Sequence, residues 1–234
     1  MKNIKQSEID SVDKVFSDVF DKYDVMNDVM SLGVHRIWKK KMIDWMNPEK
    51  GSHLIDVASG TGDIAKSFLE KIKFQGKVTC VEPNKLMFET GKKKLRNLNR
   101  INWIAASAEK LPLKDEFYDI YSVSFGIRNF SNIDKSLKEA KRVLKTGGRI
   151  VCLEFSKVEN EILKKFYKTY SKSIPYIGKY VTGKSEPYQY LIDSIEKFYN
   201  QEELAKIFEK NGFTEVKYRN LSGGIAAIHS GWKI

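Results

Sequence analysis

The segment HLIDVASGTGD, residues 53–63, constrains the fold of this chain more than any other. It begins with a short apolar run that is β-branched at Ile55 and Val57, which is typical of a buried strand in a parallel sheet. Gly60 and Gly62 then permit a sharp turn and let the backbone approach a ligand with no Cβ in the way. Beyond the turn, apolar residues recur at helical spacing. The segment therefore predicts a strand, a glycine turn and a helix in direct succession.

The acidic residues around this turn favour one class of ligand. The turn fits the dinucleotide fingerprint G-x-G-x-x-A, and Glu82 follows where a ribose-binding acid is expected. A pyrophosphate prefers bare amides at a helix N-terminus, whereas Asp56 and Asp63 would repel it. S-adenosylmethionine carries a sulfonium and an ammonium but no phosphate, so we expect it to bind here, against Asp56, Gly60, Gly62 and Glu82. The competing interpretation is structural: Asp63 favours the helix N-terminus and Asp56 ends a strand.

Bulk composition is that of a soluble globular protein. The chain has 234 residues, of which 41% are hydrophobic and 30% charged, so we expect a single domain over residues 1–234. No apolar run approaches the ~18 residues that cross a bilayer, and MKNIKQSEID lacks the apolar core of a secretory signal. Cys80 and Cys152 have no metal-like spacing and are expected to be reduced core residues. We therefore expect a cytoplasmic protein without a metal site.

The formal net charge of +11 suits an anionic partner. It arises from 41 Lys and Arg residues against 30 Asp and Glu residues. Membrane lipid and nucleic acid are both anionic surfaces that such a charge attracts. A general excess of lysine would give the same charge, so we use it only as support.

Strands alternate with helices through the middle of the chain, which predicts parallel βαβ units with right-handed crossovers. The expected strands are His53–Val57, Lys77–Val81, Ile101–Ala105, Tyr118–Ser124 and Arg149–Phe155. Helices are expected from about Gly62 to Lys71, from Pro83 onward and from about Ile133 to Leu144, the last ended by Thr146, Gly147 and Gly148 as glycine C-caps. A helix from Glu202 to Lys210, capped by Gly212, and strands near Phe213–Tyr218 and Gly224–His229 predict a terminal antiparallel hairpin.

Two helical additions flank this sheet. Residues 1–46 predict a helical cover, and residues 159–200 predict an insert rich in Tyr and Lys. Helices are expected around Ile162–Ser173 and Tyr188–Ile195, with a mobile link near Gly178–Gly183. Such a long stretch between core elements is usually functional.

Four segments carry a resemblance to a known family. They are KYDVMNDVMSLGVHRIWKK, DVASGTGD, SFGIRNFSNIDKSLKEAKRVLKTGGRIVCLEFSK and NGFTEVKYRNLSGGIAAIHSGWK. On these segments the chain resembles the UbiE/MenG C-methyltransferases of ubiquinone and menaquinone biosynthesis, from about Val15 to the C-terminus. The glycine motif is shared by all class I methyltransferases, whereas the YD-MND, SFG-RN and LEFSK segments are specific to this family. The chain departs from relatives at Ser59, often Gly or Cys, and at Glu82, often Asp.

The resemblance implies a class I methyltransferase: a Rossmann-like three-layer sandwich with a mostly parallel seven-stranded sheet. It implies methyl transfer from S-adenosylmethionine to a ring carbon of a prenylated quinol. We favour 2-demethylmenaquinol as acceptor, with the 2-methoxy-6-polyprenyl-1,4-benzoquinol of ubiquinone biosynthesis as the alternative. By motif match, the cofactor contacts would be Thr61, Glu82, Ser107, Ala108 and Ser124.

Methylation of carbon requires an electron-rich ring, so the expected substrate is the reduced quinol with an ionised hydroxyl. Candidate assisting groups are Arg128, Asn129 and Tyr23. Arg128 would stabilise an oxyanion rather than act as a base. The competing interpretations are a salt bridge from Arg128 to a loop acid such as Asp24 or Asp28, and simple packing of Tyr23.

Two further residues are weaker candidates for the site. His35 is expected to be structural, and Glu154 ends the fifth strand and could face the pocket.

The insert would form a lid over the lipid acceptor. Its Tyr, Ile and Phe residues could line a tail channel, while lysines could meet anionic headgroups of a membrane to which the protein binds peripherally. These lysines are Lys164, Lys165, Lys168, Lys172, Lys179 and Lys184. A homodimer is an open alternative to a monomer.

Three other functions are disfavoured. An exocyclic-amine nucleic-acid methyltransferase usually shows an Asn-Pro-Pro-aromatic turn where this chain has SFGIRN, and neither cysteine fits a cytosine-C5 nucleophile. RNA nevertheless remains a distant alternative substrate. An NAD oxidoreductase is disfavoured by Asp56 and Asp63. A non-enzymatic adenosine-binding module is disfavoured by the intact SFGIRN segment.

Overall fold

The computed structural model describes residues 28–29, 31, 33–183 and 185–234, and these form a seven-stranded sheet with the order β3-β2-β1-β4-β5-β7-β6. The strands are β1 (His53–Val57), β2 (Lys77–Val81), β3 (Ile101–Ile104), β4 (Tyr118–Ser124), β5 (Leu144–Phe155), β6 (Thr214–Leu221) and β7 (Ala226–Trp232). β7 runs antiparallel to both of its neighbours, whereas every other neighbouring pair is parallel. The predicted mostly parallel sheet with a terminal antiparallel hairpin is thus confirmed.

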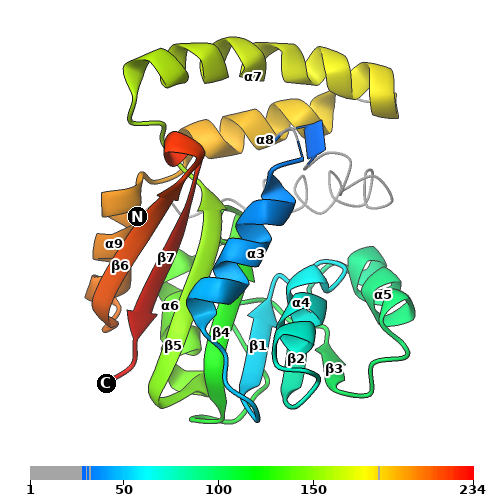
Figure 1. The fold of residues 1–234 in the computed structure, drawn as a ribbon, viewed down its shortest axis with the longest axis vertical. Helices are drawn as coiled ribbons and strands as arrows, with labels where there is room; N and C mark the ends of the chain where they lie inside the picture. The colour runs from blue at the N-terminus through cyan, green and yellow to red at the C-terminus, as the bar shows by residue number, and fades with distance from the viewer. Residues whose placement is uncertain (1–27, 30, 32, 184) are drawn as a thin grey trace.

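Helices cover both faces of the sheet (Figure 1). The helices on the faces are α3 (His35–Met46), α4 (Asp63–Lys71), α5 (Lys85–Lys94), α6 (Ile133–Val143) and α9 (Gln201–Lys210). Two further helices, α7 (Glu161–Thr182) and α8 (Glu186–Lys197), lie across one end of the sheet (Figure 1). Side chains alternate along each strand, so Leu54 joins a core with α3 and α4, whereas Ile55 joins a second core with α6 and α9. The free thiols of Cys80 and Cys152 are buried, one in each core, as predicted.

The end of α6 differs from the prediction. The helix passes directly into β5 at Leu144, and the two glycines are not its cap. Instead, Gly147 N donates to Lys233 O at 2.7 Å, and Lys233 N donates to Gly148 O at 2.9 Å. The expected helix cap was wrong because these glycines pair with the far end of the chain.

The insert also differs in one respect. Both predicted helices are present and longer, but α7 runs through Pro175 and Gly178 to Thr182, and α8 begins at Glu186. A Cβ at Gly178 would overlap the ring of Tyr188, so this glycine lets α8 pack directly against α7. Of the predicted link near Gly178–Gly183, only Gly183 lies outside α7, as its C-cap, because Gly178 serves helix packing.

The N-terminal cover is described only from residue 28. Within it, α3 buries Trp38 and Met42 against the sheet, and Trp38 Nε1 donates to Ser222 Oγ at 3.0 Å. Among the described residues, no helix combines the length and the hydrophobicity needed to span a bilayer.

Candidate active site

The candidate site lies at the carboxyl ends of β1, β2 and β4, where ligands bind in open α/β sheets. Immediately after β1 and β4, Ala58 and Phe125 adopt left-handed backbone conformations with φ of +53° and +56°. A Cβ at Gly126 would lie 2.6 Å from Ala58 Cβ, so the two loops touch. Strained residues of this kind cluster at functional sites, and here two lie side by side.

The two glycines of the turn have different roles. A Cβ at Gly62, φ +85°, would lie 2.5 Å from Leu95 Cδ1 and 3.2 Å from the ring of Trp103, so Gly62 is required for packing. Gly60, φ +55°, has Met87 Sδ as its nearest neighbour at 4.0 Å. Only Gly60 therefore leaves the backbone open to a ligand.

Glu82 joins the turn to the end of β2. Its Oε2 accepts from Gly60 N at 2.8 Å and its Oε1 accepts from Asn84 N at 2.9 Å. Asn84 in turn caps α5 by accepting from Leu86 N and Met87 N. Glu82 therefore places a carboxylate at the end of β2, beside the backbone of the glycine turn, where a ribose-binding acid is expected.

Asp56 is buried beneath the turn with one oxygen open. Its Oδ1 accepts from Ser122 Oγ at 2.6 Å, whereas its Oδ2 has no hydrogen-bond partner among the described residues. Burial raises the pKa of Asp56 to about 7, although the Ser122 hydrogen bond opposes this shift. At the end of the neighbouring strand, the buried Ser124 Oγ likewise lacks a partner in the described part of the chain. Unsatisfied buried groups are costly, and these two would suit an ammonium donor and a polar ligand atom.

Asp63 does not act as the sequence suggested. Lys39 Nζ lies 2.9 Å and Lys94 Nζ 2.8 Å from its two oxygens. Burial opposes ionisation of Asp63, but the two ammonium groups outweigh it and hold the pKa of this carboxyl well below its usual range. Its charge is therefore already balanced, and Asp56 is the acid that remains open. Lys94 also lies 3.3 Å from Thr61 Oγ1 at the turn.

The predicted adenine contacts follow β3. Ser107 is exposed, whereas Ala108 is buried in the core with Leu111 and Tyr121. Together with Glu82 and the open Asp56 oxygen, this set fits S-adenosylmethionine better than a phosphate-bearing cofactor, because it offers acceptors where a pyrophosphate requires donors.

Arg128 lies in the short helix η2 (Ile127–Asn129) beyond β4 and forms a buried ion pair. Its Nη1 donates to Glu154 Oε1 at 2.6 Å and to Phe125 O at 2.7 Å, and both side chains are 1% exposed. Burial raises the pKa of Glu154, and the Arg128 charge opposes that rise. The alternative partner Asp28 instead pairs with Arg36, with Nη2 donating to Oδ2 at 2.7 Å, and Asp24 lies outside the described residues. The expected ion pair exists, but its acid is Glu154.

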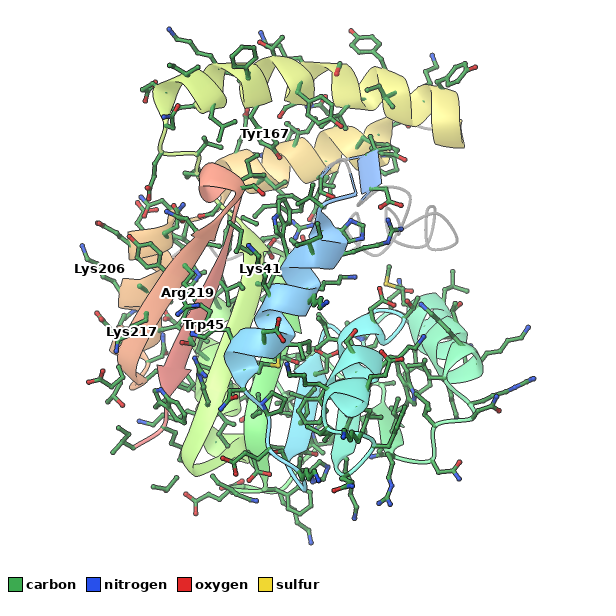
Figure 2. The ribbon with its side chains drawn as sticks, in the orientation of Figure 1. Lys41, Trp45, Tyr167, Lys206, Lys217 and Arg219 are labelled. Carbon is green, nitrogen blue, oxygen red and sulfur yellow. The ribbon has the colours of Figure 1, made fainter. Side chains whose placement is uncertain are left out.

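The lid helices reach the same short helix. Tyr190 of α8 donates its hydroxyl to Asn129 Oδ1 at 3.0 Å. Tyr167 lies on the side of α7 that faces α8 (Figure 2), and its buried hydroxyl has no hydrogen-bond partner among the described residues. Burial raises the pKa of Tyr167, and the positive charge of Arg128 opposes that rise, so the phenol lies within the field of the guanidinium.

Sequence reasoning missed Tyr167 and Tyr190. The spacing of Tyr167 from Leu163 and Tyr170, at steps of four and three residues, could have identified the inward face of α7. Of the other candidates, His35 is buried 3.0 Å from Ser31 Oγ, which fits the predicted structural role. Tyr23 lies outside the described residues. The described part of the chain contains no group of three His, Cys, Asp or Glu side chains that could hold a metal.

Known structures share this fold at low sequence identity. A SAM-dependent methyltransferase from Thermotoga maritima superposes with a TM-score of 0.66 over 94% of this chain and 99% of its own, at 21% identity. A phosphoethanolamine N-methyltransferase 2 of Haemonchus contortus, in complex with S-adenosylhomocysteine, gives a TM-score of 0.62 over 84% of this chain and 52% of its own, at 13% identity. These likenesses confirm the predicted methyltransferase fold.

Sequence comparison adds the family. Proteins described as "Ubiquinone/menaquinone biosynthesis C-methyltransferase UbiE" from Rickettsia akari and Brucella anthropi are 50% and 49% identical to this chain. The matches cover 95% of this chain in both cases, and 92% and 87% of the two relatives. A model of the ubiE/COQ5 methyltransferase family matches residues 1–233. The chain therefore belongs to the ubiE/COQ5 methyltransferase family, as its sequence motifs predicted.

Proposed function

We propose that this protein transfers a methyl group from S-adenosylmethionine to a ring carbon of a reduced, prenylated quinol, with 2-demethylmenaquinol as the acceptor. The observation that carries this proposal is the division of the strand ends into two parts. At the end of β1, Asp56 offers an acceptor oxygen without a partner among the described residues, and at the end of β2 the Glu82 carboxylate holds the glycine turn. Beyond β4, Arg128 presents a buried cation. The names of the relatives cover both ubiquinone and menaquinone biosynthesis, so the benzoquinol precursor of ubiquinone is the alternative acceptor.

The cofactor part would bind by complementary charge and hydrogen bonding. Glu82 would accept from the ribose hydroxyls, and Asp56 Oδ2 would accept from the ammonium group. Gly60 leaves the backbone open for close approach. When bound, S-adenosylmethionine supplies a methyl group already activated by its sulfonium.

The acceptor part would favour the ionised quinol. Loss of a ring hydroxyl proton places electron density on the neighbouring carbon, which then attacks the methyl group as the carbon–sulfur bond breaks. The methylated carbon subsequently loses its proton, which restores the aromatic ring. Arg128 would stabilise the phenolate oxygen, and Glu154 would hold the guanidinium in place. A preorganised cation of this kind contributes roughly 10²–10³ in rate.

Alignment would supply much of the remaining rate. Asn129 is bound by Tyr190 of α8, so the lid and the acceptor site are joined. A lid that holds ring carbon and methyl group in line converts a bimolecular encounter into a unimolecular step.

A methyl-transfer assay tests the proposal. The purified protein receives labelled S-adenosylmethionine and either demethylmenaquinone or the demethylated ubiquinone precursor, each with and without a chemical reductant. We expect label on demethylmenaquinone only after reduction. Label on the benzoquinone precursor alone would replace one acceptor by the other. Label on RNA, or on neither lipid while S-adenosylhomocysteine still binds, would overturn the quinol acceptor.

A further inference from the structure

Helix α7 has two faces of opposite environment. Its inner face packs against the rest of the protein through Tyr170 and the fully buried Ile174. Its outer face carries five large apolar or aromatic side chains, which we call the outer ridge. They are Ile162, Phe166, Tyr176, Ile177 and Tyr180, with exposed fractions of 69%, 71%, 78%, 37% and 93%. Large apolar side chains exposed together on one helix face mark interaction sites.

The outer ridge lies on one face of α7 in two groups, with Ile162 and Phe166 near the start of the helix and the other three near its end. The polar Thr169 and Ser173 lie on the same face between them. At 3.6 residues per turn, the five side chains fall within an arc of about 100°. Figure 1 shows α7 at the extreme end of the molecule, with α8 between it and the sheet. Both groups of the ridge therefore face away from the core, one near each end of α7.

A row of lysines lies beside the ridge. Lys165, Lys168, Lys172 and Lys179 are exposed and fall on one flank of the helix. None of these four forms a salt bridge with a described residue, whereas Lys164 pairs with Glu161 at 3.2 Å. An apolar ridge beside uncompensated positive charge complements an anionic lipid surface, in which side chains reach the acyl boundary and ammonium groups reach the headgroups.

From these observations we infer that α7 docks on an anionic lipid bilayer, with the outer ridge in the interfacial layer and the lysine row at the headgroups. The sequence placed the apolar residues of this insert in a tail channel, but these five point outward. Docking would place the active-site cover against the membrane, because Tyr167 lies on the inner side of the same helix. The inference deepens the proposed function, since a prenylated quinol is a membrane lipid. Its evidence, however, is the exposed surface of α7 and not the acceptor site.

Vesicle flotation tests this inference without any methyl transfer, so its failure is distinguishable from failure of the proposed acceptor. The full chain is mixed with vesicles of neutral phosphatidylcholine or of phosphatidylcholine with phosphatidylglycerol. We expect preferential binding to the anionic vesicles, weakened by salt. The double variant F166S/Y180S should lose about tenfold or more in binding. The triple variant K165Q/K168Q/K172Q should lose about 100-fold on anionic vesicles and little on neutral ones.

A matched control removes the same charge elsewhere. Lys41, Lys206 and Lys217 lie away from α7, on the β6 side of the molecule around Trp45 (Figure 2). The variant K41Q/K206Q/K217Q should bind anionic vesicles within about twofold of the unaltered protein, if α7 carries the contact. Equal loss in the two triple variants, or equal binding to both vesicle types, would overturn the inference. So would absent vesicle binding together with a dimer that F166S/Y180S converts to a monomer.

Discussion

The cofactor part and the acceptor part of the candidate site are built in different ways. On β1 and β2, the backbone of the glycine turn and the carboxylate of Glu82 form a local unit joined by a 2.8 Å hydrogen bond. Beyond β4, Arg128 depends on Glu154 from β5 and lies beneath two helices of a distant insert. The first part is encoded within about 30 residues, whereas the second requires long-range contacts. Cofactor binding should therefore tolerate changes in the acceptor part, and the predictions below test that separation.

The largest effect is expected from removal of the buried ion pair. The double variant R128M/E154Q removes both charges together, because a single loss would leave an unpaired buried charge and cost about 3–5 kcal/mol. We expect kcat for the quinol to fall roughly 10²–10³-fold, since the oxyanion loses its preorganised cation. Steady-state kinetics measures this loss.

Binding of S-adenosylhomocysteine to R128M/E154Q, followed by calorimetry, supplies the control. Affinity within about threefold of the unaltered protein would confirm that the two parts are separable. A parallel loss of cofactor affinity would show that they form one cooperative unit.

A change in the cofactor part should have the opposite pattern. In E82Q, one carboxylate oxygen becomes an amide donor, so the acid no longer accepts from both the ribose and Gly60 N. We expect the Kd of S-adenosylhomocysteine to rise by about 10–100-fold, because a charged hydrogen bond contributes about 1.5–3 kcal/mol. Y190F is the comparison, since it removes the hydroxyl by which α8 contacts Asn129 in the acceptor part. An unchanged Kd in E82Q would remove Glu82 from the cofactor site.

Asp56 links the cofactor part to pH. Its pKa in the folded protein is about 7, against an ordinary value of 3.8, because burial disfavours the charged form. Between these values the folded state holds its proton more tightly than the unfolded state, so the free energy of unfolding falls as pH rises from about 4 to 7. The loss is on the order of 4 kcal/mol. A cationic ligand needs the ionised form, so its Kd should fall about tenfold between pH 6 and 8.

The variant D56N separates these effects. It should flatten the pH dependence of stability, measured by urea unfolding of the cofactor-free protein, and weaken cofactor binding at pH 8. It also controls for titration of the ligand itself. If D56N kept the pH dependence of stability of the unaltered protein, Asp56 would not be its source.

The sequence predicted the features that depend on local patterns and missed those that depend on tertiary contacts. The bounds of β1, β2 and β4 agree with prediction because their apolar patterns and flanking glycines are local. The roles predicted for Gly147 and Gly178 were wrong because tertiary contacts decide them: Gly147 pairs with Lys233, and Gly178 packs against Tyr188 on the next helix. Local patterns cannot specify such partners.

The acids of the site give the same lesson. The charge on Asp63 looked unpaired because Lys39 and Lys94 are distant from it in sequence. For the same reason, the sequence suggested Asp24 or Asp28 as the ion-pair partner of Arg128 instead of Glu154. β4 and β5 are parallel neighbours in which Ser124 pairs with Leu153. This register brings Glu154 close to Arg128, but the sequence alone does not reveal it. Sequence motifs therefore identified the chemistry, whereas the electrostatic balance required the fold.

The smallest effect is expected at Tyr167, and it tests whether α7 takes part in the acceptor site. Y167F deletes a buried hydroxyl that has no partner among the described residues, so the protein should lose no stability and gain up to about 1 kcal/mol. If this hydroxyl donates to the quinol, kcat/KM should nevertheless fall about 5–20-fold. Stability and activity would then move in opposite directions.

Y170F, one turn along the same face, is the matched control for this prediction. The Tyr170 hydroxyl donates to Val29 O, so its loss should lower stability by about 1 kcal/mol while leaving kcat/KM within about twofold. A structural role for Tyr167 predicts the reverse of this contrast, with Y167F less stable and equally active. The two variants remove the same atom from the same helix. The difference between their kcat/KM values therefore reports contact with the substrate rather than packing of α7. That difference decides whether the inner face of α7 belongs to the acceptor part or only covers it.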